Sequence, residues 1–254
     1  MQRWILLPGA PRGLPEDFSS AWEELRGETV DQNRFRHVER VEAAGRTLFV
    51  KFFHKASWKD RLRNLLTPPR TFSQAAREVK VAALLEEAGI GTVPMAAFGE
   101  ERFGPFEKRS ILVTVGIPGP TLGEALRRDP GKAPGLAGVL EEILGRLLAR
   151  RIYLPDLSLE HILLPREAPP LLLDLHNGAG PIRWNSRRIA RMLGRLWAGA
   201  RGTVPPFLAL RSARKVLERA GTSLPAGEIL EEAARRGERW ETRERRKRRR
   251  EVEP

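Results

Sequence analysis

Strand-like runs are the main feature of the first half of the chain, which also contains one predicted helix, and helical segments dominate the second half. Residues 29–54 are strand-like, and the run at 47–53 is rich in β-branched and aromatic residues. Residues 92–98 and 110–115 have the same character. Lys51 lies inside the run at 47–53. If its side chain points inward it requires a carboxylate or phosphate partner. The alternative is a lysine on the solvent face.

One predicted helix follows residues 71–74, which have capping-box spacing, and ends at Gly89. Its apolar face is predicted to consist of Ala75, Ala76, Val79, Ala82 and Ala83. Glu78 lies beside this face, so its carboxylate should be at least half buried and should need a cation. Lys51 is the candidate cation, and a surface position for Glu78 is the alternative. Further helices are expected at 139–151, 186–200, 207–220 and 228–250.

The chain also contains segments that should connect or precede these elements. Residues 1–27 are rich in proline and glycine and read as a leader against the body, with one short helix near 18–25. Residues 116–120 can continue neither a strand nor a helix, and a second capping box follows at 121–124. We therefore predict a leader and small lobe at 1–115, a hinge at 116–120 whose backbone could hold adenine, and a helical lobe with a basic tail at 121–254.

Composition narrows the class of protein. The chain has 254 residues, no cysteine and a formal net charge of +13. It can therefore form one core or two small lobes, without disulfides or thiolate metal sites. We recognise no membrane span and no signal peptide. The absence of cysteine fits a cytoplasmic protein. The charge favours polyanionic partners, and basic residues concentrate at 55–70, which includes Lys55, and at 245–250.

Two carboxylates carry the candidate chemistry. Asp156 stands in the block 153–164, five residues before His161, and Asp174 follows an apolar run in the block 171–178. This is the layout of a kinase catalytic loop followed by its metal-binding aspartate. In that layout Asp156 takes the proton from an attacking hydroxyl and Asp174 holds Mg²⁺ on the phosphates. The plainer interpretation is two loop aspartates at strand ends.

The order of strand lysine, helix glutamate, hinge and two aspartates resembles the lipopolysaccharide core kinases, which phosphorylate heptose or Kdo of the inner core. Segments 58–66, 76–90 and 97–100 match that family, as do the Asp-x4-His and Asp-Leu-His motifs that begin at Asp156 and Asp174. The resemblance covers residues 30–200. It implies an α+β, two-lobed protein-kinase-like fold, with a small β-rich N-lobe containing one key helix and a mainly helical C-lobe.

The resemblance also implies roles for individual residues. Lys51 would contact the α- and β-phosphates of ATP, and Glu78 would orient it. Asp156 would be the catalytic base, and His161 and Asp174 would bind Mg²⁺, with Mn²⁺ as a second metal. The implied partners are ATP and the lipopolysaccharide core or a lipid-linked sugar, not nucleic acid. The expected location is the cytoplasm. A peripheral position at the anionic inner face of the cytoplasmic membrane is a further expectation.

The sequence departs from the family pattern in three places. Leu154-Pro155 replaces His-Arg before the catalytic aspartate, residues 31–42 contain no glycine, and Asn177-Gly178 is an unusual continuation. These departures keep a pseudokinase open as an alternative. A minimal protein kinase is a second alternative, although only about ten residues separate Asp174 from the helix near 186. A nucleic-acid-binding module is the third, although its aromatic residues are few and are not interleaved with basic ones.

Overall fold

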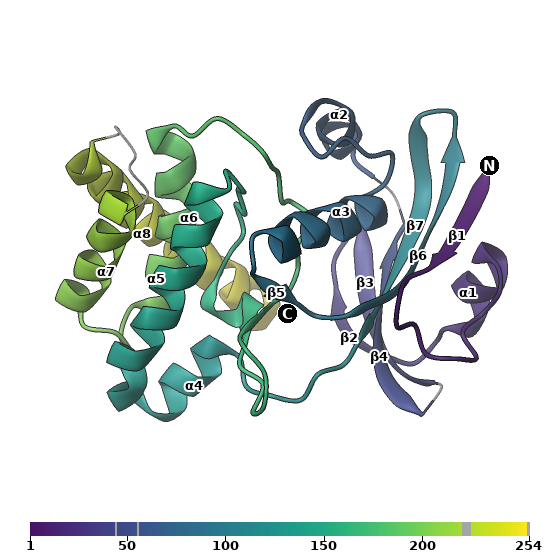
Figure 1. Cartoon of the computed structure of the whole chain (residues 1–254), viewed down its shortest axis with the longest axis horizontal. Helices are drawn as coiled ribbons and strands as arrows, with labels where there is room; N and C mark the ends of the chain where they lie inside the picture. The colour runs from purple at the N-terminus through teal and green to yellow at the C-terminus, as the bar shows by residue number, and fades with distance from the viewer. Residues whose placement is uncertain (44, 55, 220–224, 253–254) are drawn as a thin grey trace. The chain divides into compact units, whose positions relative to one another are not determined.

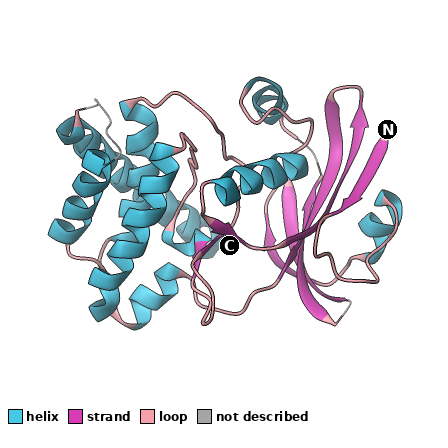
Figure 2. Cartoon of the chain, in the orientation of Figure 1, coloured by secondary structure: helices cyan, strands magenta, loops and turns pink. Residues whose placement is uncertain are grey.

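The computed structural model describes residues 1–43, 45–54, 56–219 and 225–252, so Lys55 and the predicted turn residue Ala44 lie outside it. The side chains of the basic run at 245–250 also lie outside the described part. The fold has two compact units. The first comprises Met1–Glu86, Thr92–Pro118 and Asp174–Ala179, and the second comprises Glu87–Gly91, Gly119–Leu173 and the described residues from Gly180 onward. The chain is α+β, as predicted, with most strands in the first unit (Figure 2).

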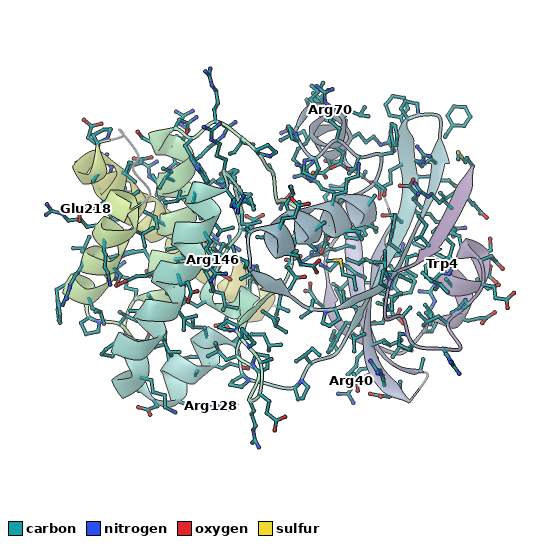
Figure 3. The ribbon with its side chains drawn as sticks, in the orientation of Figure 1. Trp4, Arg40, Arg70, Arg128, Arg146 and Glu218 are labelled. Atoms are coloured by element: carbon teal, nitrogen blue, oxygen red, sulfur yellow. The ribbon has the colours of Figure 1, made fainter. Side chains whose placement is uncertain are left out.

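The first unit is built on a six-stranded antiparallel sheet with the order β1-β6-β7-β4-β3-β2. Its strands are β1 (Gln2–Leu6), β2 (Glu28–Gln32), β3 (Arg36–Ala43), β4 (Arg46–Phe53), β6 (Met95–Phe103) and β7 (Phe106–Val115). The sequence analysis did not predict β1, because this edge strand is short and lies in a segment rich in proline and glycine, which are typical of loops. Trp4 (labelled in Figure 3) fixes this edge, since its indole Nε1 donates to the carbonyl oxygen of Pro15 at 2.8 Å.

The two faces of β4 pack against different helices, because successive side chains of a strand point to opposite faces. Leu48, Val50 and Phe52 pack in one core with Phe18 and Trp22 of α1 (Phe18–Glu24). Phe53 instead belongs to a smaller core with Ala75 of α3 (Gln74–Glu87). Figure 1 shows α1 and α3 on opposite sides of the sheet. The period of the strand therefore places Lys51 on the face that α3 covers.

Helix α3 begins slightly later than predicted and buries a different set of residues. Ser73, rather than Thr71, caps it by accepting a hydrogen bond from the amide of Ala76 at 3.2 Å. Gly89, at φ 69°, follows its end as expected. The predicted apolar face is wrong in part, because Ala83 is exposed whereas Arg77 is fully buried. Arg77 tolerates burial because carbonyl oxygens surround its guanidinium. Its Nε donates to Gly178 at 2.9 Å and its Nη1 to Thr67 and Pro69, both at 3.2 Å. Helix α2 (Trp58–Leu66) precedes α3.

The second unit is mainly helical, as predicted. The capping box at Thr121 and Glu124 is present and begins α4 (Leu122–Arg128). The next helix, α5 (Ala133–Ala149), starts earlier than expected because a proline in its first turn is compatible with helix initiation. Three more helices follow, namely α6 (Ser186–Ala200), α7 (Pro206–Arg219) and α8 (Ala226–Val252). None of the described helices combines the length and apolarity that a membrane crossing requires.

Short elements join these helices. The 3₁₀ turns are Pro130–Lys132 and Leu159–His161. Strand β8 (Ile162–Leu163) pairs with β9 (Leu171–Leu172), and β5 (Gly91–Thr92) lies next to β9 in the sheet order β5-β9-β8. Strands β8 and β9 agree with the predicted pattern, because the loop that contains Asp156 precedes β8 and Asp174 follows β9.

Candidate active site

Lys51 and Glu78 form the ion pair that the sequence predicts. The Nζ atom of Lys51 donates to both carboxylate oxygens of Glu78, at 2.9 and 3.0 Å. Glu78 is only 2% exposed, because it faces the sheet from the middle of α3. Burial by itself lowers the pKa of Lys51, but the charges of Glu78 and Asp174 more than offset it and hold the pKa above its ordinary value. The lysine is therefore a fixed cation.

Asp174 belongs to the same cluster. Its Oδ1 accepts from Lys51 Nζ at 3.0 Å, and the amide of Leu175 donates to Glu78 Oε2 at 3.4 Å. The backbone of Asp174 has φ 57°, a left-handed conformation that non-glycine residues adopt at some energetic cost and that concentrates at functional sites. Burial favours the neutral acid, but Lys51, His176 and Arg36 hold the pKa of Asp174 well below its usual range. Asp174 is therefore an anion whose position the surrounding charges determine.

Arg36 is a member of this cluster that the sequence reasoning missed. Its Nη1 and Nη2 donate to the two carboxylate oxygens of Asp174, at 2.8 and 3.3 Å. It begins β3 directly after a tight turn, where the side chain of Asn33 accepts from the amides of Phe35 and Arg36 at 2.9 and 3.1 Å. An asparagine-stabilised hairpin turn thus stands in the segment where we looked for a glycine-rich loop. The sequence analysis gave no signal for Arg36, which lies within the strand-like segment 29–54.

The unusual continuation after Asp-Leu-His has partners within the first unit. The side chain of Arg63, on α2, donates to Asn177 Oδ1, and Arg77 donates to the carbonyl oxygen of Gly178 at 2.9 Å. His176 Nδ1 lies 2.8 Å from Asp174 Oδ1. Residues 174–178 are therefore anchored by side chains from α2 and α3, and the departure from the family pattern has a structural function here.

The side chains in this cluster fit a divalent cation. Glu78, Asp174 and His176 each offer a ligand atom, and these atoms lie within 4.8 Å of one another. Carboxylate oxygens are the ligands that Mg²⁺ prefers, and an imidazole nitrogen adds affinity for Mn²⁺. Lys51 and Arg36 share the oxygens of Asp174, so a cation would have to replace at least one of their contacts. His161, the second metal ligand suggested by the sequence, lies in the second unit, and its role stays a prediction.

Asp156 lies in a loop of the second unit that apolar residues hold in place. Leu154 and Leu157, on either side of it, are 4% and 3% exposed, and the amide of Leu157 donates to the carbonyl oxygen of Leu154 at 3.2 Å. In this chain the buried side chain of Leu154 thus holds the loop in place, at the position where kinases have His-Arg before the aspartate. The Asp156 side chain is 23% exposed, and its Oδ1 lies 3.8 Å from Arg191 Nη2. Its catalytic role stays a prediction.

His161 ties this loop to the strand before Asp174. It ends the 3₁₀ turn Leu159–His161, and its amide donates to the carbonyl oxygen of Ser158 at 3.1 Å. Its carbonyl oxygen accepts from the amide of Leu173 at 2.9 Å. The backbone of His161 therefore fixes the segment that leads into Asp174, whichever group its imidazole contacts.

Comparison with known proteins identifies the family. The model of the lipopolysaccharide kinase (Kdo/WaaP) family matches residues 20–201, which is most of the chain. The chain belongs to the lipopolysaccharide kinase (Kdo/WaaP) family. This family match confirms the resemblance proposed from the motifs and identifies the chain as a kinase-family enzyme.

Individual members of the family are distant relatives in sequence. The lipopolysaccharide core heptose(I) kinase WaaP of Pseudomonas aeruginosa is 26% identical over 207 residues, which cover 70% of this chain and 77% of that protein. WaaP of Escherichia coli is 28% identical over 110 residues, or 40% of this chain and 42% of that protein. A solved structure of WaaP in complex with acyl carrier protein superposes with a TM-score of 0.68 at 22% identity, over 96% of this chain and 98% of that one. The last comparison confirms the kinase-like fold.

Proposed function

We propose that this protein transfers the γ-phosphoryl group of ATP to a hydroxyl of a lipopolysaccharide inner-core sugar. The observation that carries the proposal is the cluster of Lys51, Glu78 and Asp174, in which Lys51 is held within 3.0 Å of both acids. A lysine paired in this way to a helix glutamate is how kinases position the phosphates of ATP. The curated relatives are named heptose(I) kinases, so heptose is the first acceptor to test and Kdo the second.

In this proposal the first unit binds the charged end of the nucleotide. Lys51 donates to the α- and β-phosphates, and Glu78 keeps its ammonium group in place. Asp174 would hold Mg²⁺, with His161 as the second ligand and Mn²⁺ as an alternative metal. A divalent cation held there would supply positive charge to the phosphates.

The second unit supplies the proton acceptor. Asp156 takes the proton from the attacking sugar hydroxyl while its oxygen bonds to the γ-phosphorus, the bond from that phosphorus to the β-phosphate oxygen breaks, and ADP leaves. Its partly exposed carboxylate is reachable by an acceptor from solvent. Only a short segment lies between Asp174 and the start of α6 at Ser186, which leaves little room for the activation segment that a protein substrate would use. A sugar on a lipid or an oligosaccharide is a better match.

The test is ATP turnover by the full chain with a panel of inner-core fragments, with mass spectrometry to locate the added phosphate. We expect phosphorylation of a heptose- or Kdo-containing fragment that requires Mg²⁺ or Mn²⁺. One reaction series includes acyl carrier protein, because the solved WaaP structure is a complex with that protein. If ATP is not consumed with any fragment under either condition, the proposed function is wrong.

We also propose that the protein meets its acceptor at the anionic inner face of the cytoplasmic membrane. The chain carries a net charge of +13, and each basic residue near such a surface adds about 1 kcal/mol of attraction. Co-sedimentation with anionic and neutral liposomes tests this. We expect binding to anionic liposomes only, weakening at high salt, and weaker binding after truncation beyond Trp240. A full chain that ignores anionic liposomes at low salt would contradict this location.

A further inference from the structure

A cavity of about 520 Å³ lies beside Asp156 in the second unit, and most of its lining is cationic. Its walls come from the loop at 155–156 and from α6 and α8. The residues with charged or aromatic side chains that line it are Asp156, Arg191, Arg195, Arg236, Arg239, Trp240 and Arg243. We call this cavity the arginine pocket. It contains five arginines and a single carboxylate, so it presents a strong excess of positive charge.

The sequence periods of the two helices produce this concentration of arginine. Arg191 and Arg195 are four residues apart on α6, so they share one face. On α8 the lining residues 236, 239, 240 and 243 follow the spacing i, i+3, i+4, i+7, which also defines one face. The pocket is therefore the place where the two arginine faces meet.

Two glycines allow these faces to approach each other. A Cβ atom at Gly194 would lie 2.7 Å from the carbonyl oxygen of Ala233, and one at Gly237 would lie 3.0 Å from that of Gly194. The first distance is shorter than a Cβ atom tolerates and the second is tighter than most Cβ contacts, so the two helix backbones are in close contact at this point. The close contact brings arginines of both helices to one cavity. Because like charges repel, a bound anion would stabilise this arrangement.

Few of these cations are neutralised within the described part of the chain. Arg236 Nε pairs with Glu232 at 2.7 Å, and Arg191 lies 3.8 Å from Asp156. Among the described residues no carboxylate forms an ion pair with Arg195, Arg239 or Arg243. A group of arginines with so few acidic neighbours is typical of a site for an external carboxylate or phosphate, which a guanidinium binds through two parallel hydrogen bonds.

Arg195 adds a second observation that points to a ligand. Its guanidinium lies 4.4 Å from the ring centre of Trp240, which orients it. Its Nε is buried and has no hydrogen-bond partner among the described residues. A buried donor without a partner is unfavourable by about 1–3 kcal/mol, so such a group is generally satisfied by something that binds. The pocket therefore contains an oriented donor without an acceptor.

We propose that the arginine pocket binds an acidic group of the sugar acceptor and thereby presents the neighbouring hydroxyl to Asp156. The ligand class is an anionic saccharide that carries a carboxylate or a phosphate close to the reacting hydroxyl. This inference rests on the proposed function, because it assigns the specificity of the same reaction. A neutral sugar would leave Arg195, Arg239 and Arg243 without a counter-charge in the pocket beside Asp156.

The test uses two variants of the full chain with the same loss of charge. Arg239→Gln/Arg243→Gln removes two exposed arginines of the pocket that form no ion pair with Asp156 among the described residues. Arg187→Gln/Arg235→Gln is the matched control, because it removes two exposed arginines of the same helices outside the pocket. Both variants should retain the melting temperature of the parent, since exposed positions contribute little to stability.

The first readout is steady-state kinetics with acceptor fragments that carry a carboxylate, a phosphate or neither. For the anionic acceptor we expect the pocket variant to raise KM roughly 5- to 30-fold, the effect of losing two partly exposed ion pairs, with the KM for ATP unchanged. The control variant should change neither. The acid whose KM responds identifies the group that the pocket holds, and a rise in the KM for ATP instead would assign the pocket to the nucleotide and overturn the proposal.

The second readout is binding without turnover, which separates this inference from the proposed function. Glucuronate, glucose 6-phosphate and glucose are titrated into the full chain and followed by ligand-observed NMR. We expect one or both acids to bind, glucose not to bind, and the pocket variant to lose the binding that the control retains. Equal binding of all three sugars, or acid binding that survives in the pocket variant, would overturn the arginine pocket even if phosphoryl transfer is observed.

Discussion

Asp174 and Asp156 are the two aspartates of the kinase layout, and their surroundings differ in charge balance. Asp174 is held by Lys51 at 3.0 Å and by Arg36 at 2.8 Å, inside a cluster that also contains Glu78. Two cations and two carboxylates there balance each other. Asp156 instead stands at the edge of a pocket with five arginines and no other carboxylate. The cations of the first site are paired with its carboxylates, whereas three arginines of the second have no ion pair among the described residues, and there we propose an external anion.

This difference indicates how each site should respond to substitution. A buried ion-pair network loses stability when one partner is removed, because the remaining charge stays desolvated. A partly exposed carboxylate in a polar pocket has water as an alternative partner, so its loss affects function more than folding. Substitution of Asp156 should therefore lower activity alone, whereas substitution in the Lys51 cluster should lower both activity and stability.

The largest effect on turnover is expected from Asp156→Asn. Asparagine keeps the shape of the side chain but cannot accept the hydroxyl proton, so kcat should fall roughly 10²- to 10⁴-fold. The side chain is 23% exposed and its ion pair with Arg191 is long, at 3.8 Å. The melting temperature and the affinity for ATP should therefore change little. Steady-state kinetics and nucleotide titration measure both quantities. Full activity in this variant would remove Asp156 from the mechanism.

Lys51→Met should combine a loss of activity with a loss of stability. Removing a positioned cation from the phosphates should lower turnover by roughly 10²- to 10³-fold, the range measured for single electrostatic donors. The protein should still fold, but with a free energy of unfolding about 3 kcal/mol lower, because Glu78 remains buried without its partner. Urea denaturation measures that change.

The double variant Lys51→Met/Glu78→Gln distinguishes these two losses. It removes the uncompensated buried charge, so it should recover much of the stability while turnover stays as low as in Lys51→Met. If the double variant recovers activity as well, Lys51 acts only through Glu78 and has no direct role in phosphoryl transfer.

The position of this ionic cluster could be predicted because it follows from backbone periods. Residue 51 shares a strand face with Phe53, and residue 78 lies on the buried side of a helix with Ala75. Both facts follow from local spacing, and charge complementarity then pairs the two residues. The two aspartates likewise follow from their positions next to short apolar runs.

Arg36 and Arg77 could not be predicted, because their environments depend on distant residues. Arg77 is buried against carbonyl oxygens of Thr67, Pro69 and Gly178, and no local sequence pattern predicts that these acceptors lie near it. Its burial displaced the predicted apolar face and left Ala83 exposed. Arg36 contacts a residue 138 positions away in the sequence. The arginine pocket also escaped prediction, since it requires two helices to pack at particular glycines.

Arg36→Gln probes whether the first site must open to bind metal and nucleotide. Arg36 occupies both oxygens of Asp174, so its removal should lower the Mg²⁺ concentration needed for half-maximal nucleotide binding. Without metal, nucleotide affinity should fall roughly 5- to 10-fold, because the cluster that contains Lys51 loses one positive charge. Nucleotide titrations with EDTA and with increasing Mg²⁺ measure both. Arg40→Gln, an exposed arginine of the same strand that is labelled in Figure 3, is the control. No change in either titration would mean that Arg36 is only a structural ion-pair partner.

The smallest effect on activity, but a clear effect on stability, is expected at Glu107, a buried carboxylate of the first unit that lacks the cations of the Lys51 cluster. Burial raises its pKa to about 7. Hydrogen bonds from the Ser110 hydroxyl at 2.5 Å and from the amide of Gln74 at 3.2 Å lower the pKa, but they offset only part of the effect of burial. The folded state therefore binds this proton more tightly than the unfolded state does. Its contribution to stability is fully present below pH 4.5 and is lost as the pH rises through about 7, by roughly 3 kcal/mol in total.

Glu107→Gln should remove that dependence, because glutamine retains an acceptor but has no charge to bury. We expect a higher melting temperature than the parent at pH 8, little difference at pH 5, and unchanged kinetics, since Glu107 has no contact with the Lys51 cluster among the described hydrogen bonds. Glu86→Gln, which removes an exposed carboxylate from α3, should show no such pH-dependent gain. Thermal denaturation of the three proteins from pH 5 to 8 decides the matter. A parent protein and a Glu107 variant with parallel stability profiles would show that this carboxylate is solvated or paired, and the contrast between compensated and uncompensated buried acids would then fail within the first unit.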